Sequence, residues 1–224
     1  MNRTSKLMLA LALGGLAPLS LAACSDTMMN PKGSPMTMNH GGGAASKAAD
    51  LRSGLDGLLG EHVNLAASAT RAALNGRKGE YDAAVATLDN NSMDIAKAIG
   101  SVYGPQAQEA FLGLWRSHIN MVVDYTVGTA SNEKAKQDKA VKDLLGYAQD
   151  FGAFLNGANP RLTKEAVAEM VKHHVVTLKD VIDAQAAKDD RKAYQALRTA
   201  HGHMAMIAKA LADAIAKQYP EKFA

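Results

Sequence analysis

Three histidines recur in this sequence at a fixed interval of 56 residues, and imidazole is the side chain most often used to bind transition metals. They are His62, His118 and His174, and the residues around them align between the three copies. Each lies on a run of apolar residues spaced three and four apart, which is typical of the buried face of a helix. The pattern therefore predicts three imidazoles that point inward at one depth.

Further imidazoles and thioethers follow in the third copy, between 201 and 206. Imidazole and thioether ligands suit copper, and Cu(I) in particular, better than they suit hard cations. These residues of the third copy could together form a copper site. We expect His62 and His118 to contribute ligands to that site only if the three copies surround a common axis. The candidate ligands of the third copy are His174, His201, His203, Met204 and Met206.

A purely structural interpretation competes with metal binding, because buried imidazoles need hydrogen-bond partners. In an antiparallel helix pair, His62 would lie level with Asn91 and Ser92, and His118 would lie beside Tyr147. Each imidazole could then be satisfied within its own pair. The two methionines of the third copy would fill gaps in the core, as methionine often does.

A second candidate copper site lies outside the helical region, in residues 24–45. This segment is rich in glycine, proline and methionine, so we expect a flexible tether that buries little apolar surface. Within this segment, the five residues 36–40 contain two thioethers and an imidazole, those of Met36, Met38 and His40. The alternative is a methionine-rich spacer without ligands.

Residues 46–224 carry a helical pattern throughout, with abundant alanine and no run of β-branched residues. Turn-forming segments divide this region at 75–79, 103–105, 131–132, 156–160 and 188–190. A fixed period of this length indicates a repeated unit of supersecondary structure. We predict an all-α domain, a six-helix bundle built from three tandem αα-hairpins with a period of 56 residues, although an open stack of hairpins remains an alternative.

The N-terminus has the pattern of an export signal in residues 1–23, with Arg3 and Lys6 before an interrupted apolar run. Leu21-Ala22-Ala23-Cys24 resembles the lipobox of bacterial lipoproteins, and Cys24 is the only cysteine of the chain. The resemblance implies a lipidated Cys24 that anchors the protein to a membrane. In a Gram-negative cell this is the outer membrane, facing the periplasm, and in a Gram-positive cell the exterior of the cell membrane. An ordinary secretory signal with a chance cysteine is the alternative.

Charge and motifs exclude several classes of function. The formal net charge of +3 falls to +1 (3 minus 2) when Arg3 and Lys6 leave with the signal, so no nucleic-acid partner is expected. The chain has no Cys-x-x-Cys-His motif for c-type haem, no nucleophile elbow and no glycine-rich phosphate loop. We therefore predict no enzymatic activity, and we keep a b-type haem held by His and Met as a remote alternative to copper.

Several short stretches resemble a family of secreted bacterial helical domains, some of whose relatives are labelled copper amine oxidase-like. The resemblance covers about 45–224 and implies the hairpin domain and an extracytoplasmic copper context, but no activity. It brings no catalytic residues to this chain. The stretches are 58–62, 99–104, 115–119, 123–126, 203–206 and 218–223.

Together these patterns predict a lipid-anchored periplasmic helical bundle that binds or buffers a soft metal, with copper as the expected ion. The rival hypothesis is a non-catalytic structural or interaction module of the cell envelope that binds a protein partner and no metal. That hypothesis predicts fully hydrogen-bonded core histidines and an exposed apolar patch. The sequence leaves the oligomeric state and any partner's identity open.

Overall fold

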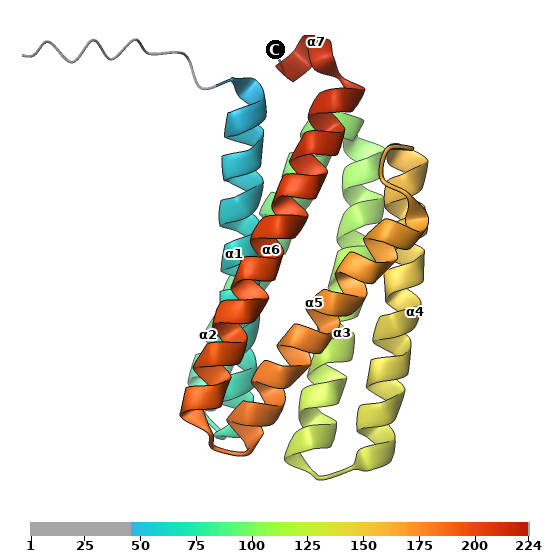
Figure 1. The fold of residues 1–224 in the computed structure, drawn as a ribbon. Helices are drawn as coiled ribbons and strands as arrows, with labels where there is room; N and C mark the ends of the chain where they lie inside the picture. Colours follow the sequence, from blue (N-terminus) through green and yellow to red (C-terminus); the bar gives the residue numbers. More distant parts are fainter. Residues whose placement is uncertain (1–45, 224) are drawn as a thin grey trace, which may run out of the picture. The chain divides into compact units, whose positions relative to one another are not determined.

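The computed structural model describes residues 46–223, which form six long helices and one short C-terminal helix (Figure 1). Pairs of consecutive helices are joined by tight turns, so the predicted all-α bundle of three tandem hairpins is confirmed. The helices are α1 (Lys47–Leu74), α2 (Lys78–Tyr103), α3 (Pro105–Ala130), α4 (Lys134–Ala158), α5 (Lys164–Ala186), α6 (Asp190–Gln218) and α7 (Pro220–Phe223).

Local sequence signals explain where these helices begin. The side chains of Ser46, Thr163 and Asp189 each accept a hydrogen bond from a backbone N–H in the first turn of the helix that follows, which satisfies one of the otherwise unpaired donors there. Pro105 occupies the first position of α3, where its fixed φ angle suits a helix start. Gly104, with φ 92°, makes the sharp link between α2 and α3.

The six long helices close into a ring. Each helix packs against its neighbours in the chain, and α6 returns to pack against α1. In addition, α1, α3 and α5 contact one another, while α2, α4 and α6 each fill the space between two of these three. Since successive helices are antiparallel, α1, α3 and α5 run in the same direction. The three hairpins therefore surround a common axis, and the open stack is excluded.

The axis is lined by residues that occupy equivalent positions in the three repeats. Leu59 of α1, Trp115 of α3 and Val171 of α5 lie one helical turn before the repeated histidines, and all three are buried. The polar layer that the hairpin pattern predicts is buried as well. Its members are His62, Asn91, His118, Tyr147, His174, His203 and Met204.

Some predictions concern residues outside the part of the chain that the structure describes. The export signal in 1–23, the lipidated Cys24 and the tether ligands Met36, Met38 and His40 all belong to this group and remain predictions. Within residues 46–223, every helix is too short or too polar to cross a membrane.

Candidate metal centre

The three repeated histidines meet on the axis of the bundle, one from each of α1, α3 and α5. His62, His118 and His174 are 1%, 4% and 6% exposed, so all three imidazoles are buried. Their ring centroids lie 5.4 to 6.5 Å apart, and one ring nitrogen from each lies within 4.8 Å of the other two. This arrangement is close enough to bind a metal ion.

The spacing of two of these nitrogens matches that of ligands on one ion. His62 Nε2 and His118 Nε2 are 3.4 Å apart. Imidazole nitrogens bind a metal at about 2.0–2.1 Å, so two of them on one tetrahedral or trigonal ion are separated by about 3.3–3.6 Å. Hence His62 and His118 stand at coordination distance, although without a metal the same contact is a hydrogen bond between the two rings, and a ring nitrogen of His174 lies within 4.8 Å of both.

All three imidazoles are neutral at physiological pH, which leaves a free lone pair on each for a metal. Burial lowers the pKa of His118 to about 3, and the neighbouring His174 adds to this effect. Burial likewise lowers the pKa of His174 to about 4, assisted by the nearby His203. The pKa of His62 falls well below its ordinary value through burial and through both other imidazoles. The physical cause is that a buried charge loses its hydration.

The structure does not support the alternative in which each imidazole is hydrogen-bonded within its own hairpin. Asn91 donates instead to the Leu58 carbonyl and to the Glu61 carboxylate. Ser92 donates to a carbonyl of its own helix, and the Tyr147 hydroxyl has no partner among the described residues. Both ring nitrogens of His174 and Nδ1 of His62 also lack protein partners there.

Two further side chains frame the three imidazoles. The indole of Trp115 packs against His62 and His118, with ring centroids 4.8 and 4.7 Å away. Met204 of α6 is 1% exposed and lines a cavity of about 40 Å³ together with His118 and His174. This thioether is therefore a candidate for a fourth ligand, because it shares a cavity with two of the imidazoles.

The remaining predicted ligands of the third repeat lie away from the axis. His201 is exposed and lies over Gly60 of α1, with its Nδ1 3.4 Å from the Asn64 side-chain nitrogen. Met206 is 57% exposed. His203 is buried, but its Nε2 donates to the Met170 carbonyl at 2.8 Å, so this nitrogen is already engaged. Of the predicted set, the structure brings together His62, His118, His174 and Met204.

Sequence reasoning overlooked Trp115 as part of the site. Its position carried the signal, because residues three apart on a helix share a face and Trp115 precedes His118 by three residues. An indole contributes no metal ligand here, but it covers one side of the imidazoles with an apolar ring and keeps water away from them.

The fold and the site define an all-α bundle of three hairpins with a buried three-histidine centre. Comparison with models of protein families, with curated proteins and with solved structures gave no significant match for this chain. Its function therefore has to be argued from the site itself.

Proposed function

We propose that this protein binds one copper ion, as Cu(I), between His62, His118 and His174 at the centre of the bundle. The observation that carries the proposal is the convergence of three neutral, buried imidazoles, two of them already at coordination distance. A metal ion would also give a partner to one ring nitrogen of His174, since both nitrogens of this ring lack hydrogen-bond partners among the described residues. Such unpaired polar atoms in a core each cost about 1–3 kcal/mol.

The charge of the site favours a monovalent ion. All three candidate ligands are neutral, and no carboxylate or thiolate of the described residues belongs to the cluster. A divalent ion would therefore keep both of its charges in an apolar interior, where an uncompensated charge is strongly penalised. Imidazole suits zinc, iron and nickel as well as copper, but of these metals copper is the one that commonly binds as an ion with a single charge. The thioether of Met204 adds a soft donor near the same centre.

The cellular setting of the proposal rests on the N-terminal pattern. With Cys24 lipidated, the bundle would stand in the periplasm on the outer membrane, where it would hold or buffer copper. The rival envelope module without metal predicts fully hydrogen-bonded imidazoles. His62 and His118 contact each other through Nε2, but both ring nitrogens of His174 lack a partner among the described residues, and this favours the metal site.

Removing one of the three imidazoles is expected to weaken Cu(I) binding by at least about 100-fold. Each ligand makes a direct bond to the ion, and loss of a residue that only hydrogen-bonds to a ligand already costs about 10- to 100-fold. The measurement is a competition titration of the full-length protein against a coloured Cu(I) chelator under nitrogen. His174→Leu is the test variant. His201→Leu is the matched control, since this exposed imidazole lies outside the cluster.

Wild-type protein and His201→Leu should bind one equivalent with the same affinity, and His174→Leu should lose it. If all three proteins bind Cu(I) equally weakly, the bundle holds no copper site and the envelope module becomes the better hypothesis. A stoichiometric site that survives in His174→Leu would transfer the proposal to other residues, first among them the methionines of the tether.

A further inference from the structure

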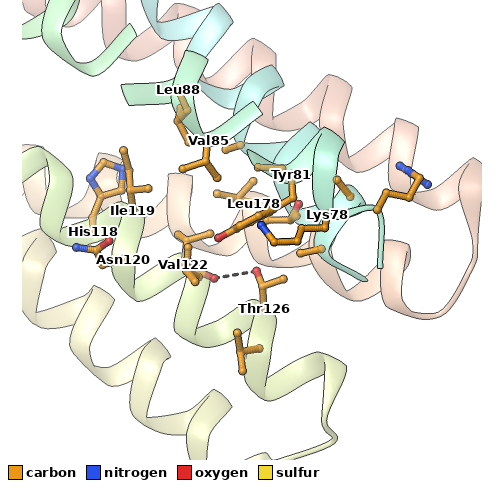
Figure 2. A pocket seen from close by; sticks show the side chains of 18 of the residues that line it. Lys78, Tyr81, Val85, Leu88, His118, Ile119, Asn120, Val122, Thr126 and Leu178 are labelled. Atoms are coloured by element: carbon orange, nitrogen blue, oxygen red, sulfur yellow. Dashed lines mark hydrogen bonds between the residues drawn. The ribbon is translucent and has the colours of Figure 1, made fainter. Parts of the chain in front are cut away.

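An apolar cavity of about 500 Å³ leads from the surface to the three-histidine centre, between α1, α2 and α3. Its outer end lies at the α1–α2 turn, where Gly76, Arg77 and Lys78 are exposed. At its inner end it reaches the buried imidazoles of His62 and His118. Figure 2 shows the His118 ring at one end of this pocket and Lys78 at the other.

The cavity arises from a break in the internal repeat. Ala66 stands one turn after His62, where the equivalent positions hold Val122 and Leu178. Ala69 stands where the other two hairpins have a tyrosine and a valine. With Ala72 and Ala73, these small side chains form one wall of the cavity. The first hairpin, α1 and α2, thus has smaller apolar side chains at these two positions than the other two hairpins have at the equivalent positions.

The cavity presents no unpaired charge to a ligand. At the outer end Arg77 forms an ion pair with Glu80, and Lys78 Nζ lies 2.6 Å from an oxygen of Asp82. The hydroxyl group of Thr126 in the wall donates to a backbone carbonyl of α3, as the dashed line in Figure 2 marks. Valine, leucine and isoleucine side chains such as Val85 and Ile119 make up most of the remaining surface, to which Tyr81 and Asn120 add polar groups (Figure 2).

The inner end offers a position for one donor atom. An ion held by three imidazoles can accept a fourth ligand, as in zinc sites with three protein ligands and an open position. A donor from the cavity would then take the place that the Met204 thioether could otherwise fill. Two of the three imidazoles line the cavity, so a small molecule in it would lie next to the side chains that hold the ion. The volume falls within the range of about 300–1,000 Å³ that small-molecule sites occupy.

We propose that this cavity binds an uncharged, mostly apolar small molecule that completes the coordination of the metal with a single nitrogen or sulfur donor. The inference rests on the proposed copper site, because the metal supplies the polar contact. The alanine wall supplies the apolar contact, and the paired charges at the outer end disfavour a charged ligand, which would have to lose its hydration on entering.

The test compares 4-phenylimidazole with imidazole as ligands of the Cu(I)-loaded full-length protein, by calorimetric titration under nitrogen. The phenyl ring should lie against the alanine wall and raise the affinity at least about tenfold over imidazole, through burial of apolar surface. Ala66→Leu introduces the side chain found at Leu178 and should abolish this preference. Ala69→Val, which copies Val181, provides a second and milder filling of the same space. Ala83→Leu, on an exposed part of α2 outside the cavity, is the control.

Preference for 4-phenylimidazole in the wild type and in Ala83→Leu, lost in the two filled variants while their Cu(I) affinity stays unchanged, supports the proposal. Equal affinity for the two azoles in a protein that does bind Cu(I) overturns the cavity proposal and leaves the copper site standing. Failure of the wild type to bind Cu(I) overturns the copper site and with it the donor contact.

Discussion

Replacement of His62, His118 and His174 together by leucine should stabilise the metal-free protein and abolish its copper site. Each imidazole is buried without sufficient hydrogen-bond partners, and a core polar group left unpaired costs about 1–3 kcal/mol. Leucine removes that cost and adds apolar burial at similar volume, much as buried ion pairs can be replaced by apolar residues with a gain in stability. We expect the free energy of unfolding to rise by about 3 kcal/mol.

Urea denaturation in the presence of a copper chelator measures this effect. His201→Leu, which changes an exposed imidazole, should leave the free energy of unfolding within about 0.5 kcal/mol of the wild type. A triple variant less stable than the wild type would show that the imidazoles act as a satisfied polar network in the core. A gain in stability would instead show that the three imidazoles lower the free energy of unfolding, as residues of a binding site often do.

Acidification is expected to unfold the metal-free protein between about pH 6 and pH 4. In the unfolded chain each histidine binds a proton below about pH 6.5, whereas in the fold the pKa of His118 is about 3 and that of His174 about 4. The pKa of His62 is also well below its ordinary value. Across this interval the unfolded state binds more protons than the folded state, so stability must fall as the pH falls.

The three histidines together give a slope that approaches about 4 kcal/mol per pH unit near pH 5, and each one accounts for about 1.4 kcal/mol per pH unit. Chemical denaturation at a series of pH values gives the free energy of unfolding as a function of pH. Its slope should be shallower for His118→Leu than for the wild type, by about 1.4 kcal/mol per pH unit. Bound Cu(I) should oppose acid unfolding, because it binds the folded state alone. Equal slopes in wild type and variant would mean that the imidazoles exchange protons freely in the fold.

The fold was largely predictable because one pattern repeats three times. A period of 56 residues, with helix breakers at matching places, indicates three copies of one hairpin. An apolar seam that contains His62 in the first copy and His118 in the second can only direct both rings toward the core. The convergence of the three rings also required that the hairpins close around an axis, and this depends on the contact between α6 and α1, which no local pattern specifies.

The ligand set of the third repeat was less predictable, because residues that are close in sequence on a helix can face different ways. Met204 and Met206 are two positions apart and therefore lie on nearly opposite sides of α6. Met204 is buried and Met206 is 57% exposed. His201 is likewise turned outward. A cluster of ligand types in the sequence thus divides between the core and the surface once the helix is formed.

The apolar cavity could not be predicted from the sequence without the fold. Alanine is frequent throughout the helices, so Ala66 and Ala69 do not stand out in the chain. Their importance appears only when they are seen beside α2 and α3, with His62 at the inner end of the space they leave. The internal repeat supplies the comparison afterwards, since Leu178 shows what a filled position looks like.

A copper ion on the bundle axis, bound to three imidazoles from three hairpins, would be visible by anomalous diffraction. The measurement uses the copper edge and crystals of the Cu(I)-loaded protein. We expect a single peak at about 2.0–2.1 Å from a ring nitrogen of each of His62, His118 and His174. A peak at His201 and Met206 on the surface of α6, or a core that stays without copper while the rings keep their places, would contradict it.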